Sequence, residues 1–196
     1  MPVRTLTSEN EGRLAFDGAL ARASGDLPGT VAVVDLGGGS TEIAIGNAQL
    51  GATWVRSADL GSLRLTGAHL PDDPPTARQV RHARDAARRA LSELNPPPPD
   101  HGIAVGGSAR ALGKIIGSRL SAAALDDVVA RLARKSAAKS ARSFGISAER
   151  AETLLAGALL LSEACRVLNT TLELGRGGLR EGVALELAAL DAVRAA

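Results

Sequence analysis

The sequence has 196 residues, of which 45% are apolar and 2% are aromatic, and its formal net charge is +2. This length suits one large domain, or one domain with part of another, and the shortage of aromatic residues predicts a core of Ala, Leu, Val and Ile. The small net charge excludes an argument for nucleic-acid binding from charge alone, and the near absence of base-stacking aromatic residues excludes a specific nucleic-acid partner.

The first residues predict a short strand over Val3–Leu6, followed by a helix that begins at Ser8. Ser8 and Glu11 have the spacing of a capping box, in which each residue satisfies a free backbone N–H of the first helical turn. The helix is expected to end near Gly25, before a Leu-Pro-Gly turn.

Three short apolar segments then predict an antiparallel meander. Val31–Val34 is a continuous β-branched run, typical of a buried strand, and the tight turn Gly37–Ser40 follows it. Glu42–Ile45 and Leu50–Val55 alternate as two further strands. A mixed sheet with an antiparallel start is therefore expected.

The rest of the chain alternates between helical and extended patterns, which is typical of an α/β fold. Pro96–Pro99 is interpreted as a rigid loop, and Ser147 as a helix N-cap. Helices are predicted at Ala77–Leu94, Ala109–Ile116, Leu125–Ala133, Ala148–Leu168 and from about Leu179, with strands at Ile103–Val105 and Thr171–Leu174.

The single cysteine, Cys165, excludes an intramolecular disulfide and favours a reducing compartment. It lies in an apolar run, which predicts a buried residue. Charged residues interrupt the start of the chain before a signal peptide can form, and no apolar run reaches the length of a membrane span. We expect a soluble, cytoplasmic protein without a membrane partner.

Basic residues cluster in two stretches of the sequence. Two interpretations stay open: solvated helix faces, or a positive field that attracts a polyanion. The clusters are Arg78, Arg81, Arg84, Arg88 and Arg89, and then Arg131, Arg134, Lys135, Lys139 and Arg142.

The strongest motif runs from Asp35 to Glu42, with the sequence DLGGGSTE. Its three glycines let the backbone approach a ligand closely and present successive N–H groups to an anion, and Ser40 adds a hydroxyl. Asp35 and Glu42 contribute carboxylate oxygens, which Mg²⁺ prefers as ligands. The pattern predicts a phosphate site in a turn between two strands.

This motif resembles the phosphate-binding signature of the exopolyphosphatase / guanosine pentaphosphate phosphohydrolase family. Further resemblances follow in the same order as in that family: SENEGRLAF at 8–16, the stretch 60–76, VGGSARAL at 105–112, ERAETLLAGALLL at 149–161 and GGLREGVALE at 177–186. The resemblance implies a lobe of the actin-like ATPase (ribonuclease H-like) fold. It also implies Mg²⁺-assisted release of the terminal phosphate of polyphosphate or guanosine pentaphosphate, and a homodimer is compatible with it.

The resemblance also implies a role for each site residue. Glu11 is expected to be the general base that activates water, although its spacing from Ser8 equally suits a simple helix cap; Glu9 is the alternate base. Asp35 and Glu42 are expected to hold Mg²⁺. Phosphate contacts are expected from Gly37, Gly38, Gly39 and Ser40 of the first turn and from Gly106, Gly107 and Ser108 of a second one.

The chief departure from the family is a missing first lobe, which in the family carries a Gly-Ser-Asn-Ser-like phosphate motif. We therefore expect residues 1–25 to be a remnant of that lobe and residues 26–196 to form the second lobe. Ser108 stands where the family often has Thr, and Gly12 where many members have Ala.

Three functions compete: a phosphohydrolase, a polyphosphate- or nucleotide-binding lobe without turnover, and a kinase or ATPase of the same superfamily. The Glu11 segment and GGLREG favour the first function over the third. Arg13 is interpreted as structural, and Arg180 as a surface arginine or an anion contact. His69, His82 and His101 lack metal-ligand spacing.

Overall fold

A computed structural model describes residues 5–195, and side chains as far as residue 192. The predicted strand Val3–Leu6 lies largely outside the described residues, and its described part, Thr5 and Leu6, has no regular structure.

The centre of the protein is a six-stranded sheet with the strand order β3-β2-β1-β4-β6-β5. The first three strands pair antiparallel, whereas β4 and β6 run parallel to β1. The predicted α/β class and the antiparallel start of a mixed sheet are confirmed. The strands are β1 Val31–Leu36, β2 Thr41–Asn47, β3 Gly51–Ala58, β4 His101–Val105, β5 Arg119–Leu120 and β6 Leu172–Leu174.

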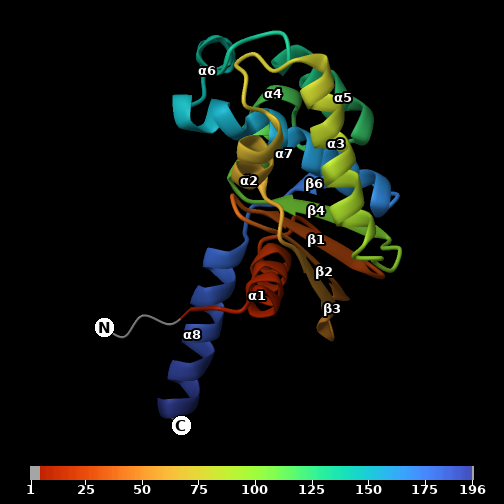
Figure 1. Cartoon of the computed structure of the whole chain (residues 1–196). Helices are drawn as coiled ribbons and strands as arrows, with labels where there is room; N and C mark the ends of the chain where they lie inside the picture. The colour runs from red at the N-terminus through yellow and green to blue at the C-terminus, as the bar shows by residue number, and fades with distance from the viewer. Residues whose placement is uncertain (1–4, 196) are drawn as a thin grey trace.

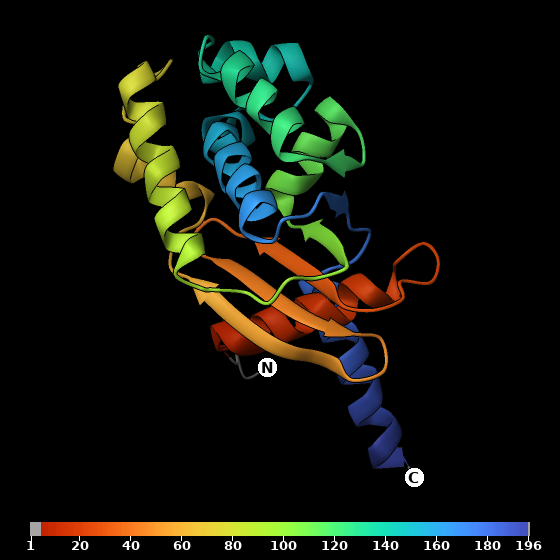
Figure 2. The same cartoon turned by 90° about the vertical axis from the view of Figure 1, so that its right-hand side faces the viewer.

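Helices cover both faces of the sheet (Figures 1 and 2). Two of them, α1 Ser8–Ala21 and α8 Leu179–Ala195, lie on one face, and the end of α8 projects away from the body. The opposite face carries α2 Ser62–His69, α3 Ala77–Ser92, α4 Gly107–Ile116, α5 Ala122–Leu132, α6 Ala137–Phe144 and α7 Ala148–Val167.

The alternation of side chains along β1 divides the core in two. Val31 and Val33 contact α1, in a small cluster that includes Phe16. Ala32 and Val34 belong to the larger core beneath the other helices. Because Asp35 continues the series of Val31 and Val33, it lies on the α1 face.

The start of α1 differs from the sequence prediction. Thr7 is the N-cap, with an extended backbone, and its Oγ1 accepts a hydrogen bond of 3.2 Å from the N–H of Asn10. Ser8 is already helical, so the predicted capping box of Ser8 with Glu11 is wrong, and Glu11 is not engaged in it. The predicted cap of α7 is confirmed, because the Ser147 side chain accepts from the N–H of Arg150.

The helices α1 and α8 cross at glycines. A Cβ added at Gly18 of α1 would overlap the carbonyl oxygen of Gly178 and lie 2.5 Å from the amide nitrogen of Gly182. A Cβ at Gly182 would overlap the carbonyl oxygen of Leu14 in the same way. The two backbones therefore touch directly, and the crossing has no room for a methyl group.

We predict that Gly18→Ala lowers the free energy of unfolding by roughly 1–3 kcal/mol, because the extra methyl group forces the two helices apart. The measurement is urea unfolding followed by circular dichroism. Gly67→Ala is the matched control: this glycine lies inside α2 with no atom within 4 Å of an added Cβ, so its substitution should leave stability unchanged or raise it. Equal stability of the Gly18→Ala variant and the original protein would contradict the tight crossing.

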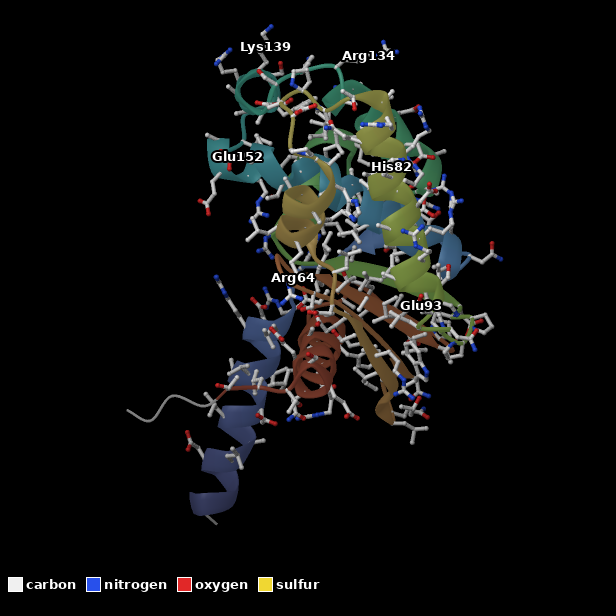
Figure 3. All side chains as sticks on the ribbon, viewed as in Figure 1. Arg64, His82, Glu93, Arg134, Lys139 and Glu152 are labelled. Carbon is white, nitrogen blue, oxygen red and sulfur yellow. The ribbon has the colours of Figure 1, made fainter. Side chains whose placement is uncertain are left out.

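The first basic cluster is partly structural. Arg84 contacts Glu163 and Asp126, each at 2.8 Å, and Glu163 is only 1% exposed. Arg88 contacts Glu163 as well, at 3.3 Å. In the second cluster, Arg134 and Lys139 lie at the far end of the molecule from α1 (Figure 3).

Cys165 is buried in α7, as predicted, and its thiol contacts the carbonyl oxygen of Leu120 at 3.1 Å. Burial raises the pKa of this thiol to about 11. Among the described helices, none combines the length and the apolar composition that a membrane crossing requires.

Candidate active site

The glycine turn Gly37–Ser40 joins β1 and β2, as the sequence predicted, and does not begin a helix. The N–H of Gly37 donates to the carbonyl oxygen of Ser40 at 3.1 Å and closes the turn. The start of α2 binds the turn from behind: the N–H of Ser62 donates to Gly37 O at 3.0 Å, and the N–H of Leu63 donates to Gly38 O at 2.9 Å. The carbonyl groups of Gly37 and Gly38 are therefore occupied by the start of α2.

Gly61 makes this contact possible. A Cβ at Gly61 would lie 2.5 Å from the carbonyl carbon of Gly38 and 2.7 Å from Gly37 O, closer than side-chain carbons approach backbone atoms. Arg64, in the first turn of α2, lies on the side of that helix nearest α1 (Figure 3), and its guanidinium contacts Asp59. The sequence from Gly61 to Arg64 thus fixes the orientation of the glycine turn.

Unlike the carbonyl groups of Gly37 and Gly38, three N–H groups of the turn have no hydrogen-bond partner among the described residues. Within residues 5–195, no acceptor contacts the N–H of Gly38, Gly39 or Ser40. All three residues line a cleft of about 630 Å³. A row of unpaired N–H groups beside a cleft is a site for an anion.

Four carboxylates line the same cleft, and three of them, Glu11, Asp35 and Glu42, are acids that the sequence predicted; the fourth, Glu181, accepts a hydrogen bond from the N–H of Gly178. Asp35 and Glu42 are direct partners across the antiparallel pair of β1 and β2, so their side chains share the face that α1 covers. Glu11 comes from the first turns of α1. The next residue, Gly12, lies directly on Glu42, because a Cβ there would be 3.4 Å from the Glu42 Cβ. The sequence prediction thus named three acids that the fold brings together.

Burial, and to a lesser extent the neighbouring negative charges, raise the pKa values of Asp35 and Glu42. Burial raises the pKa of Asp35 to about 6, with the negative charges of Glu42 and Glu11 acting in the same direction and Arg110 opposing them. Burial also raises the pKa of Glu42, which is 3% exposed, although hydrogen bonds from Ser40 and Ser57 oppose the rise. The Ser57 hydroxyl donates to Glu42 Oε1 at 2.8 Å. Cationic charge is therefore favourable in the cleft.

The pair of carboxylates formed by Asp35 and Glu42 suits a divalent metal such as Mg²⁺, even though it is not a closed set of ligands. Among the described residues, no group of three metal-ligating side chains is already arranged around a common point. Mg²⁺ does not need such a cage, because it usually keeps several waters and takes one or two carboxylates together with substrate phosphates. The neighbouring carboxylates of Asp35 and Glu42 match that requirement.

The second glycine turn lies against the end of β1, just before the first glycine turn. Gly106 has φ of +97°, and a Cβ there would lie 2.6 Å from Leu36 O and 3.1 Å from Asp35 Oδ1. Gly106 and Gly107 line the cleft. Ser108 is 1% exposed and is not part of the cleft lining; its hydroxyl faces α7, where Arg150 Nη1 donates to it at 3.4 Å.

Three arginines complete the cleft. Arg110 comes from α4, Arg176 from the segment before α8, and Arg180 from the first turn of α8. The sequence had indicated only Arg180 as a possible anion contact; Arg110 and Arg176 were not predicted. Arg13 points elsewhere, as predicted: it contacts Glu186 at 2.8 Å and Asp17 at 3.4 Å.

We predict that Asp35→Asn stabilises the metal-free protein at neutral pH. The folded-state pKa of Asp35, about 6, lies above the ordinary value of 3.8 for an aspartate side chain, so the folded protein holds this proton more tightly than the unfolded chain does. The free energy of unfolding therefore falls as the pH rises from about 4 to 6, by an amount on the order of 2–3 kcal/mol. Asparagine removes this loss, because it does not ionise.

The measurement is thermal unfolding of both proteins in a chelator at pH 4 and pH 7.5. We expect similar stability at pH 4, where Asp35 is protonated, and a more stable variant at pH 7.5. A stability difference that is the same at both values would contradict the raised pKa.

Comparison with known proteins agrees with this architecture. Residues 1–190 match the model of the Ppx/GppA phosphatase family. Exopolyphosphatase 1 of Mycobacterium tuberculosis (strain ATCC 25618 / H37Rv) is 33% identical over 200 residues, which cover 93% of this chain and 58% of that protein. The guanosine-5'-triphosphate,3'-diphosphate pyrophosphatase of Vibrio atlanticus is 27% identical over 199 residues, 94% of this chain and 39% of that protein.

A crystal structure of the Aquifex aeolicus member of the Ppx/GppA family superimposes with a TM-score of 0.86 at 24% identity, over 95% of this chain and 64% of that one. This likeness confirms the predicted actin-like fold class. The chain spans 58% of the length of the mycobacterial relative. The match over residues 1–190 decides the family: the chain belongs to the Ppx/GppA phosphatase family.

Proposed function

We propose that this chain carries the catalytic cleft of a phosphohydrolase that releases the terminal phosphate of inorganic polyphosphate or guanosine pentaphosphate. The observation that carries the proposal is the convergence of Glu11, Asp35 and Glu42 on one cleft with the unpaired N–H groups of the glycine turn. The names of the relatives support the same chemistry, since they include an exopolyphosphatase and a pyrophosphatase.

Glu11 is the proposed general base. In the reaction, the water oxygen forms a bond to the terminal phosphorus, the bridging P–O bond breaks, and the shortened phosphate chain leaves. A carboxylate beside the water orients it and accepts its proton. Glu11 suits this role because it lines the cleft and is free of the helix cap, which Thr7 provides.

Asp35 and Glu42 are the proposed holders of Mg²⁺. When bound, the ion would neutralise part of the phosphate charge. The two carboxylates would hold the ion at the end of β1, next to the glycine turn. Burial raises the pKa values of both acids, and a neighbouring cation would favour their charged forms.

The N–H groups of Gly38, Gly39 and Ser40 are the proposed cradle for the phosphoryl oxygens, with Arg110 and Arg180 across the cleft. Donors held in place before the reaction stabilise the charge that develops in the transition state. The start of α2 supplies this rigidity, since its hydrogen bonds prevent the turn from rotating its carbonyl groups into the cleft.

A binding lobe without turnover is the second candidate. It is favoured by the coverage of the mycobacterial relative, of which this chain spans 58%. The division into a first-lobe remnant, residues 1–25, and a second lobe, residues 26–196, stays a prediction. A cytoplasmic location and a homodimer also stay predictions; the buried thiol of Cys165 is in keeping with a reducing compartment.

Phosphate release from long-chain polyphosphate with Mg²⁺ separates the two candidates. We expect little release by the 196-residue chain alone, and clear release once the first lobe of a full-length family member is joined to its N-terminus. In-line attack needs water, base and phosphate held in register, and an error of about 1 Å costs roughly 10²-fold. Rapid release by the short chain would refute the need for further residues, and no release by either would favour the binding lobe.

A further inference from the structure

The strand β3 has eight residues where its antiparallel partner β2 has seven. Ile45 pairs with Trp54, and the next residue of β2, Gly46, pairs with Ala52, so Thr53 has no partner in the ladder. Such an extra residue is a β-bulge, and it shifts the alternation of side chains by one position. The Thr53 hydroxyl donates to the carbonyl oxygen of Ile45 at 3.3 Å. The part of β3 after the bulge is therefore turned over relative to the part before it.

The packing on the two faces of the sheet shows this shift. Ala52 and Val55 both pack against the small cluster on the α1 face, although they are three positions apart and a regular strand would place them on opposite faces. Trp54 packs against the larger core on the other face. A Cβ at Gly46 would overlap the carbonyl oxygen of Gly51, so this glycine allows the two backbones to approach at the bulge.

The bulge decides which residue of β3 lies beside Glu42. With the bulge, Ser57 is the direct partner of Glu42, and its hydroxyl donates to Glu42 Oε1 at 2.8 Å. Without the bulge, the register of Gly46 with Ala52 would continue along the strands and pair Glu42 with Arg56. One extra residue therefore exchanges a guanidinium for a hydroxyl on the face that α1 covers.

This exchange matters for a carboxylate that is to hold a metal ion. An arginine beside Glu42 would form a bidentate ion pair and engage both carboxylate oxygens. The Ser57 hydroxyl donates to one oxygen and leaves the negative charge in place, and a hydrogen bond of this kind orients a metal ligand. Arg56 lies on the opposite face, where it pairs with Ile43, and its guanidinium carbon is 5.8 Å from the centre of the Trp54 ring.

We propose that Ser57 is a positioning residue for the carboxylate of Glu42, and that the β-bulge at Thr53 places it there instead of Arg56. This inference rests on the proposed function, in which Asp35 and Glu42 hold Mg²⁺, and deepens it. Ser57 acts through Glu42, because its hydrogen bond restricts the rotation of a carboxylate that the ion must find in place. Thr53 acts only on the register of the two strands.

The first test is calorimetry of Mg²⁺ binding to the full 196-residue chain. Ser57→Ala should weaken binding roughly 10–100-fold, the usual effect of removing a hydrogen bond to a metal ligand. Ser57→Thr keeps the hydroxyl in a strand, where β-branched residues are well accepted, and should bind nearly as the original protein does. Ser57→Arg places a guanidinium beside Glu42 in the original register and should remove measurable binding. Ser92→Ala, which removes an exposed hydroxyl at the end of α3, is the control.

The second test changes the register itself. Deletion of Thr53 should pair Glu42 with Arg56 and remove measurable Mg²⁺ binding, and circular dichroism reports whether the fold is retained. The same deletion combined with Arg56→Ser returns a hydroxyl to the position beside Glu42 and should restore binding. A general loss of structure would not be repaired by this one substitution.

Each outcome supports or overturns a defined part of the proposal. Unchanged affinity in Ser57→Ala, or an equal loss in Ser57→Thr, overturns the positioning role and leaves the proposed function standing. A folded deletion variant that binds normally, or a folded double variant that does not bind, overturns the role of the bulge. If the deletion prevents folding, Ser57→Arg decides, since normal binding by it overturns the exclusion of Arg56. Failure of the original protein to bind Mg²⁺ overturns the metal site of the proposed function as well.

Discussion

Replacing Glu11 by Gln is expected to lower the rate of phosphate release by roughly 10²–10⁴-fold, the usual contribution of a general base. Glutamine keeps the size and hydrogen bonding of the side chain, and it lacks only the basic carboxylate. The fold should not change, because Thr7 caps α1 and Glu11 takes no part in the cap. The measurement is the turnover number and KM for polyphosphate, with Mg²⁺, in the chain joined to the first lobe of a full-length family member.

Glu9→Gln is the matched control for this substitution. Glu9 lies in the same first turn of α1 but is exposed and does not line the cleft. We expect near-normal turnover for it. Full activity of the Glu11→Gln variant, combined with a loss in the Glu9→Gln variant, would move the base to Glu9. Unchanged turnover in both would remove base catalysis by α1 from the mechanism.

Gly38→Val is expected to reduce the affinity for phosphate chains by roughly 10²-fold or more, since each charge-assisted hydrogen bond that it blocks contributes about 1.5–3 kcal/mol. Gly38 is in the middle of the turn, and a branched side chain there competes with the ligand for the space beside three N–H groups. Calorimetry with tripolyphosphate measures this loss, and circular dichroism measures folding.

The fold should survive this substitution. A Cβ at Gly38 lies 3.5 Å from the Leu63 Cβ, an ordinary contact, and Gly38 is not among the glycines with positive φ. Gly67→Ala, at a position in α2 where an added Cβ has no atom within 4 Å, should bind normally. Equal affinity of the Gly38→Val variant and the original protein would take the glycine turn out of the phosphate site.

The sequence predicted the elements whose signals are local. Within a few residues, the sequence indicates the apolar run of β1, the three glycines after it and the Ser147 cap. Each of these features is found where it was expected. Glu11, Asp35 and Glu42 could be named as a set only through the resemblance to a known family. Glu11 lies 24 positions before Asp35 and 31 before Glu42, which is beyond the reach of a local sequence pattern.

What the sequence did not reveal depends on contacts between distant segments. The eight residues of α2 are too few for a clear helical period, and the role of that helix arises only when it meets the glycine turn. The strands β4 and β6 run parallel to β1, so the carboxyl ends of all three strands meet at one edge of the sheet. Arg110 follows β4 and Arg176 follows β6, and both therefore reach the cleft at that edge. Ser108 faces Arg150, a partner from a helix 42 positions further along.

The burial of Cys165 allows the rate at which the native protein opens to be measured by thiol labelling. The sequence contains one cysteine, and burial keeps its thiol protonated, with a pKa of about 11, so a thiol-specific reagent cannot react with it while α7 is packed. Each labelled molecule therefore records one opening of the helical layer. Mass spectrometry of the labelled fraction over time would give the opening rate of the native protein, without introducing a dye or a new residue.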